Sequence, residues 1–158
     1  MKPTNPKSKL IRTLMWLGGI LGSLVLLSVI YMAVMMSRTS DVPSDLDYST
    51  TQLSDKGLFN VSYTVSTGTI PINQIHQWTL HVERADGTPV EDASIAIDGD
   101  MPQHGHGLPT KPRVTQDLGK GDYLVDGMKF QMGGWWLMDF TITDNGETDT
   151  VHFNMMLK

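Results

Sequence analysis

Two runs of alternating residues enclose a turn sequence near the end of the chain: Trp136-Leu-Met-Asp-Phe-Thr-Ile142, Asp144-Asn-Gly-Glu-Thr148 and Val151-His-Phe-Asn-Met-Met-Leu157. Every second residue of each run is large and apolar, which is the period of a β-strand with one buried face. Asn-Gly between two such runs is a strong signal for a tight hairpin turn. The stretch therefore predicts a β-hairpin and favours a fold made of antiparallel sheets.

The same period of two recurs upstream of this hairpin. It is found in Gly57–Ser66, Gln74–Glu83 and Ala93–Asp98, and Val114–Asp126 reads as two short strands around a glycine turn. The total is about seven short strands with turns roughly ten residues apart, a pattern typical of sandwiches. We therefore predict an all-β domain over residues 57–158, with an immunoglobulin-like antiparallel β-sandwich architecture.

A long uncharged segment precedes this domain. No charged side chain lies between Thr13 and Ser37, and as a helix this run exceeds the roughly 30 Å hydrocarbon core of a bilayer. The alternative is a cleaved signal peptide, which normally has a shorter apolar stretch and a small-residue cleavage site. We predict one N-terminal transmembrane helix over residues 13–37, followed by a tether over residues 38–56.

The charges flanking the apolar run give its orientation. Lys and Arg precede the run without any acid, whereas all 17 Asp and Glu residues follow it. Basic residues on one flank place that flank in the cytoplasm, so residues 1–12 are predicted to be a cytoplasmic basic tail and the C-terminal domain to face outward. The acidic balance of the outer part offers nothing to phosphate backbones and argues against nucleic-acid partners.

Two short segments carry the residue types that bind soft metals. The first reads Met101-Pro-Gln-His-Gly-His-Gly107, and the second reads Gly127-Met-Lys-Phe-Gln-Met-Gly-Gly-Trp-Trp136. In an extended segment, two histidines that are two residues apart leave the same face of the chain. Imidazoles and thioethers suit copper(I), and the chain has no cysteine to supply thiolates. The candidate metal ligands are His104, His106, Met101, Met128 and Met132.

An interpretation of these segments without a metal is also possible. Gly-His-Gly can be a polar loop, the methionines can fill gaps in the core, and Trp135 and Trp136 can seal one end of the sandwich or form an edge that contacts another envelope protein. His76 falls on the core side of its strand, whereas His81 and His152 alternate outward. Nothing in the sequence positions a nucleophile, an acid or a base, so we do not expect an enzyme.

The two metal-ligand segments, with Gly121-Asp-Tyr123 between them, resemble the YtkA-like domain family and its FixH-like relatives. The shared pattern is Met-Pro-x-His-x-His, then a Gly-x-Tyr strand, then Met-x-Gly-x-Trp. The resemblance implies a bacterial protein with an immunoglobulin-like sandwich, and its FixH-like side implies copper delivery to haem-copper oxidases.

Two functions follow as expectations from these residues and this resemblance. The first is a periplasmic module, held in the bacterial inner membrane by a single pass, that binds copper(I) and delivers it during assembly of an envelope metalloprotein such as an oxidase. The second is a metal-free structural or protein-interaction module of the cell envelope.

Overall fold

The computed structural model of the chain describes residues 22–32 and 42–158. The chain divides into two units, residues 1–40 and 41–158, and in the first of them residues 22–32 form a helix with exposed apolar side chains. Within the described ranges, no helix is both long enough and apolar enough to cross a bilayer. The predicted basic tail and the larger part of the predicted anchor lie outside the described residues.

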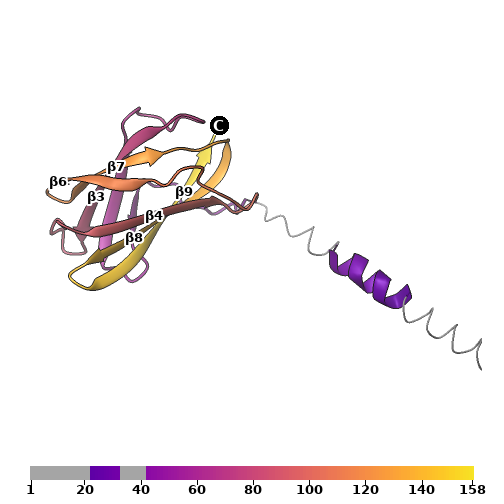
Figure 1. Cartoon of the computed structure of the whole chain (residues 1–158). Coiled ribbons are helices and arrows are strands. Elements are labelled where there is room, and N and C mark those ends of the chain that lie inside the picture. The colour runs from indigo at the N-terminus through magenta and orange to yellow at the C-terminus, as the bar shows by residue number, and fades with distance from the viewer. Residues whose placement is uncertain (1–21, 33–41) are drawn as a thin grey trace, which may run out of the picture. The chain divides into compact units, whose positions relative to one another are not determined.

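The strands of the second unit form two sheets (Figure 1). The pairings between its strands are antiparallel, as the sequence predicts. The first sheet has the order β1-β2-β3-β7-β6, with bounds Thr51–Leu53, Phe59–Val65, His76–Arg84, Asp122–Met128 and Arg113–Gly119. The second has the order β5-β4-β8-β9, with bounds His106–Gly107, Ser94–Met101, Gly134–Asp144 and Glu147–Leu157.

Aromatic side chains join the inner faces of the two sheets. The rings of Tyr63 on β2 and Phe153 on β9 meet edge to face at 5.0 Å, and those of Trp78 on β3 and Phe140 on β8 lie 6.2 Å apart. Burial alternates along β2, β3, β8 and β9, as expected for strands with one face in the core. The second unit is therefore a β-sandwich.

The C-terminal hairpin has the turn that its sequence predicts. Asp144 on β8 pairs with Glu147 on β9, and the two residues between them, Asn145 and Gly146, have φ angles of 49° and 83°. Positive φ at both central residues is the geometry of a type I′ turn, whose twist matches that of the flanking strands.

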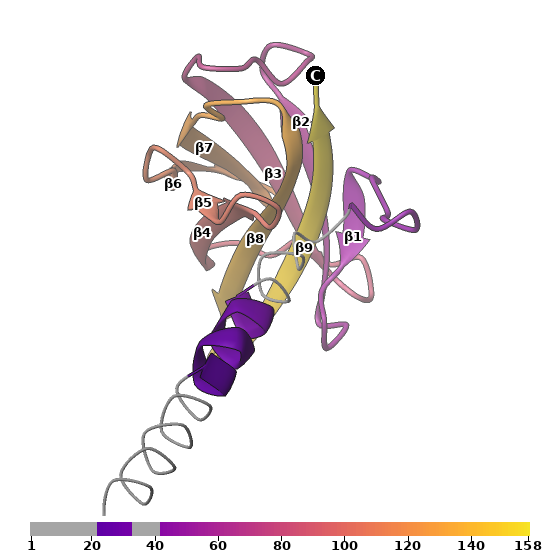
Figure 2. The same ribbon diagram turned by 90° about the vertical axis from the view of Figure 1, so that its right-hand side faces the viewer.

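The segment predicted as a tether, residues 38–56, includes a short strand. Thr51–Leu53 forms β1 and pairs with β2. This strand has no buried side chain, so it adds backbone hydrogen bonds to a sheet edge and leaves no alternating pattern in the sequence. The two-residue strand β5, visible beside β4 in Figure 2, escapes sequence reasoning for the same reason.

Candidate functional site

The His-Gly-His segment forms a hairpin at the end of β4. The carbonyl of Met101 accepts hydrogen bonds from the backbone N–H groups of His104 and Gly105, at 2.9 Å and 2.8 Å. Gly105 has a φ of 64°, a left-handed conformation that glycine adopts without strain. The segment is therefore not extended through both histidines: His104 lies in the turn, and only His106 lies in a strand.

The turn nevertheless brings the two imidazoles together. The ring centres of His104 and His106 are 6.3 Å apart and the ring planes differ by 16°. Both residues are exposed. The site therefore offers two imidazoles to solvent at close range.

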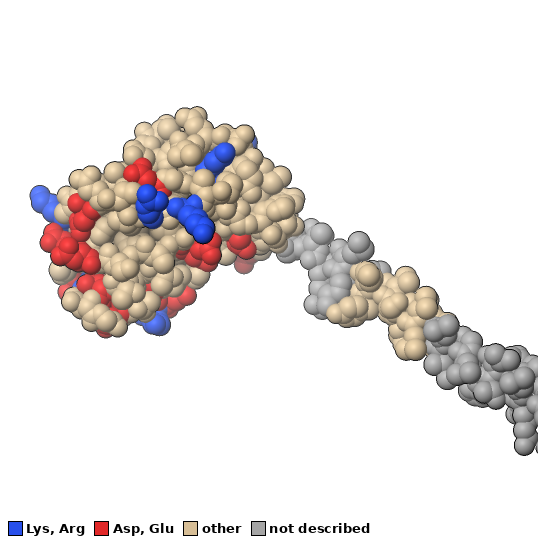
Figure 3. Space-filling model, in the orientation of Figure 1, with Lys and Arg blue, Asp and Glu red and all other residues tan. Residues whose placement is uncertain are grey.

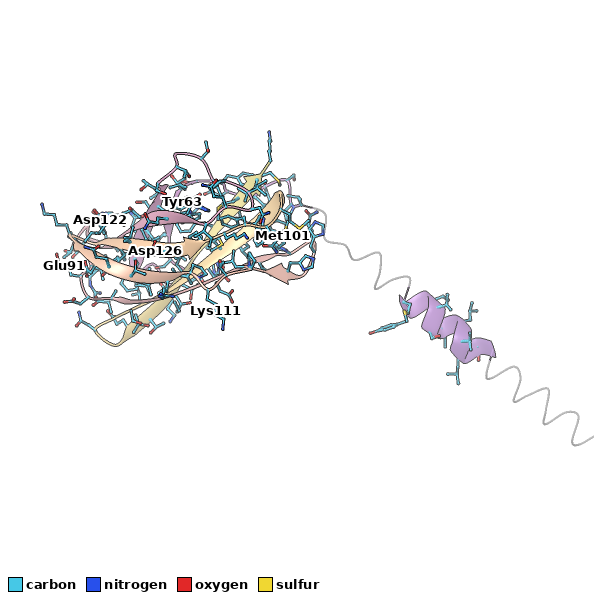
Figure 4. All side chains as sticks on the ribbon, turned by 45° about the horizontal axis from the view of Figure 1, so that its top comes forward. Tyr63, Glu91, Met101, Lys111, Asp122 and Asp126 are labelled. Atoms are coloured by element: carbon cyan, nitrogen blue, oxygen red, sulfur yellow. The ribbon has the colours of Figure 1, made fainter. Side chains whose placement is uncertain are left out.

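The second candidate segment runs beside the first. The hydroxyl of Thr110 donates a hydrogen bond of 2.6 Å to the carbonyl of Gly127, and the amide of Gln131 donates one of 3.3 Å to the carbonyl of Gly107. A Cβ atom added to Gly134 would lie 2.8 Å from Cε of Met101. The structure thus places the two segments together at one end of the sandwich, where Figure 4 shows Met101, far from Glu91 and Asp122.

The three candidate methionines differ in exposure. Met101 and Met128 are 0% exposed, whereas Met132 is 38% exposed. Met101 pairs with His106 across β4 and β5, and directly opposed side chains of an antiparallel pair lie on one face of the sheet. Met132 is the only one of the three that solvent reaches, and Met101 is the one that pairs in register with a histidine of the hairpin.

The two neighbouring tryptophans are both buried, but only Trp136 belongs to the hydrophobic core between the sheets. Trp135 is 8% exposed and donates a hydrogen bond of 3.0 Å to the side-chain oxygen of Asn154. Trp136 is 0% exposed and donates one of 3.1 Å to the carbonyl of Met132. The alternative in which these rings form an exposed contact edge is therefore wrong.

Two of the remaining histidines sit between carboxylates on the surface. The ring nitrogens of His81 lie 2.6 Å from an oxygen of Asp122 and 3.1 Å from one of Glu83. His152 has the same arrangement with Asp139 and Asp55. Both rings lie on outward faces, as the alternation predicts, but each takes part in ion pairs that the sequence does not reveal.

No group of three or more His, Asp or Glu side chains that could hold a metal is found in residues 22–32 and 42–158. Acidic side chains are spread over the face of the domain in Figure 3 and do not gather around one hollow.

The fold and the site define a small β-sandwich module that carries a histidine pair on an edge hairpin. The chain belongs to the YtkA-like family, whose model matches residues 50–141. This match begins next to β1, includes both candidate segments and ends within β8. A search of curated proteins and a search of solved structures each gave no match.

Proposed function

We propose that this chain is a membrane-anchored periplasmic module that binds copper(I) and passes it to a partner during assembly of an envelope metalloprotein. The observation that carries the proposal is the exposed histidine pair, His104 and His106, with ring centres 6.3 Å apart. The apolar run of residues 13–37 and its basic flank support the anchor and its orientation. The two packed antiparallel sheets support the finer expectation of an immunoglobulin-like architecture.

The ring spacing is just beyond that of a shared ion, so a small closure of the turn would be needed for both rings to bind it. Metal–imidazole bonds are about 2 Å long, so two rings that bind one ion through a nitrogen each have centres at most about 6 Å apart. The two rings lie close to that limit, and Gly105 between them allows small adjustments of the turn.

The sulfur donors give the site its preference for a soft metal. Thioethers and imidazoles favour copper(I) over hard cations. Met132, 38% exposed, follows Gln131, which is hydrogen-bonded to the His-Gly-His hairpin. Met132 is therefore the sulfur that can reach an ion held by the histidines, and Met101 supports the hairpin from beneath.

Titration of the full chain in detergent with copper(I), against a competing chelator, tests the proposal. The double substitution His104→Ala, His106→Ala is expected to lower the copper(I) affinity by about tenfold or more, because it removes both imidazoles. The matched control, His81→Ala with His152→Ala, removes two imidazoles elsewhere and is expected to leave the affinity unchanged. Equal affinities for the first variant and the unmodified chain would defeat the assignment.

A further inference from the structure

His76 presents a bare ring nitrogen inside the sandwich. The residue is 5% exposed on the core face of β3, and its Nδ1 lies 3.1 Å from the carbonyl of Gln74. Because a carbonyl only accepts hydrogen bonds, Nδ1 carries the proton and Nε2 carries a lone pair. Nε2 is buried and has no hydrogen-bond partner among the described residues. Such a group costs free energy unless something binds it.

A methionine lies opposite His76 in the pairing of β3 with β7. His76 pairs with Met128 across β3 and β7, and Met128 is 0% exposed. Directly opposed residues of an antiparallel pair have Cβ atoms about 4.5–5.5 Å apart, with both side chains on one face. The imidazole and the thioether therefore enter the same region of the core.

A bulge in β7 produces this pairing. His76 pairs with Met128 and Trp78 with Val125, so a step of two residues on β3 meets a step of three on β7. The extra residue reverses the alternation and turns Met128 toward the core. Gly127, with a φ of 84°, supplies the left-handed backbone that such a bulge uses.

Aromatic rings surround the imidazole. The rings of Trp78 and Phe130 have their centres 6.3 Å and 6.0 Å from that of His76. Aromatic rings attract a desolvated cation within about 6 Å of a ring centre. A cation bound at Nε2 would therefore be shielded from water and have aromatic rings nearby.

We propose that Nε2 of His76 and the sulfur of Met128 form a second, buried site for a soft monovalent cation, copper(I) or its analogue silver(I). A histidine that binds a metal through one nitrogen commonly donates the other N–H to a carbonyl, as His76 does to Gln74. A neutral imidazole with a thioether is a donor set for soft ions. Burial lowers the pKa of His76 and so favours its neutral form.

Met128 directly follows a residue that joins the two candidate metal segments. Thr110, from the segment that follows the His-Gly-His hairpin, is hydrogen-bonded to the carbonyl of Gly127, the neighbour of Met128. An ion taken up at the hairpin would thus have a storage position along the adjoining strand. The inference rests on the proposed function only for the choice of copper(I) as the physiological ion.

Silver(I) titration of the full unmodified chain in detergent, followed by NMR of the histidine ring nitrogens, tests the buried site. The Nε2 resonance of His76 is expected to move from the position of a free lone pair to that of a metal-bound nitrogen. Assignment uses His76→Gln, in which this resonance is missing. A Nε2 resonance that stays unchanged at saturating silver(I) would overturn the inference.

Two variants separate the buried site from the surface site. Although Met128 was a candidate ligand of the histidine pair, its side chain is 0% exposed whereas His104 and His106 are exposed, and the proposed surface site uses Met132. Met128→Leu conserves side-chain volume and is therefore expected to abolish the His76 shift while leaving the His104 and His106 shifts in place. Met155→Leu, another buried methionine, is the matched control and should change neither. If silver(I) shifts the His76 resonance of the unmodified chain but not those of His104 and His106, the proposed function is contradicted and the buried site is not. If the His76 shift survives in Met128→Leu, the buried site is contradicted.

Discussion

His152 and Asp139 face each other on β9 and β8, with 2.6 Å between Nδ1 of the imidazole and a carboxylate oxygen. The other ring nitrogen lies 3.2 Å from Asp55, in the turn after β1. Burial alone would lower the pKa of His152, but the hydrogen bonds and charges of Asp139 and Asp55 outweigh it and raise the pKa above 6.5. The ion pair thus connects the β8–β9 hairpin to the edge of the other sheet.

This ion pair should make the domain more stable at mildly acidic pH. A raised folded-state pKa gives a contribution that is complete below the unfolded pKa of about 6.5 and is lost as the pH rises through the folded value. For a half-exposed pair the contribution is about 1 kcal/mol or less.

Urea unfolding on either side of neutrality should show the urea midpoint falling as the pH rises, and His152→Gln should reduce that fall. The part of the pH dependence that comes from His81, whose pKa is also raised, should remain in His152→Gln. An identical pH dependence in the variant would contradict this role.

Asp149 should be the most sensitive acidic residue of the domain. It is 2% exposed, and its carboxylate accepts hydrogen bonds from the backbone N–H groups of Lys56 and Leu58. Burial would raise its pKa, but these hydrogen bonds, with that of Ser54, lower it below 3.8. Its contribution to the free energy of unfolding is therefore complete above the unfolded-state pKa and is lost as the pH falls through the lower, folded-state pKa.

Replacement of Asp149 by Ala should lower the free energy of unfolding by about 3 kcal/mol, because it leaves buried donors without an acceptor. Asp149→Asn keeps the shape and one acceptor oxygen, so its loss should be smaller. Denaturant unfolding at neutral pH measures both variants. A value for Asp149→Ala equal to that of the unmodified chain would show that the turn after β1 does not depend on this carboxylate.

Two methionines of the candidate site should respond differently to truncation. Met101 is 0% exposed, so Met101→Ala leaves a cavity and should cost about 2–5 kcal/mol of stability. Met132 is 38% exposed, and Met132→Ala should cost about 0.5 kcal/mol or less. Thermal unfolding of the two variants compares them directly. Similar losses would mean that Met132 also packs as a core residue.

The bulge at Gly127 should tolerate Asn better than Ala. Gly127 has a φ of 84°, and the heavy atom nearest to an added Cβ would be Cα of Pro112, at 3.5 Å. This is an ordinary contact distance, so the penalty comes from the backbone conformation. Gly127→Ala should therefore cost about 1–2 kcal/mol, whereas Asn, which adopts left-handed conformations more readily, should cost less. Chemical denaturation gives the difference, and equal losses would indicate that the φ of this residue is not the cause.

Local pattern determined the strands with buried side chains. The runs around Trp78, Phe140 and Phe153 alternate in the sequence and in the structure, since each strand buries one face. Asn145-Gly146 determined the C-terminal turn, because positive φ at both positions is a property of these residue types. The two candidate metal segments were also visible, as residue types at short spacing.

Tertiary structure alone decided which donors meet and which are accessible. The burial of Met101 and Met128, the pairing of His76 with Met128 and the partners of Asp149 all depend on contacts between strands distant in the chain. A single bulge at Gly127 reverses the faces of the residues that follow it, and the composition of the strand does not record that reversal. The sequence thus determined the kinds of ligand atoms, whereas register and packing decided their positions, because side-chain direction in a sheet is fixed by pairing with the neighbouring strand.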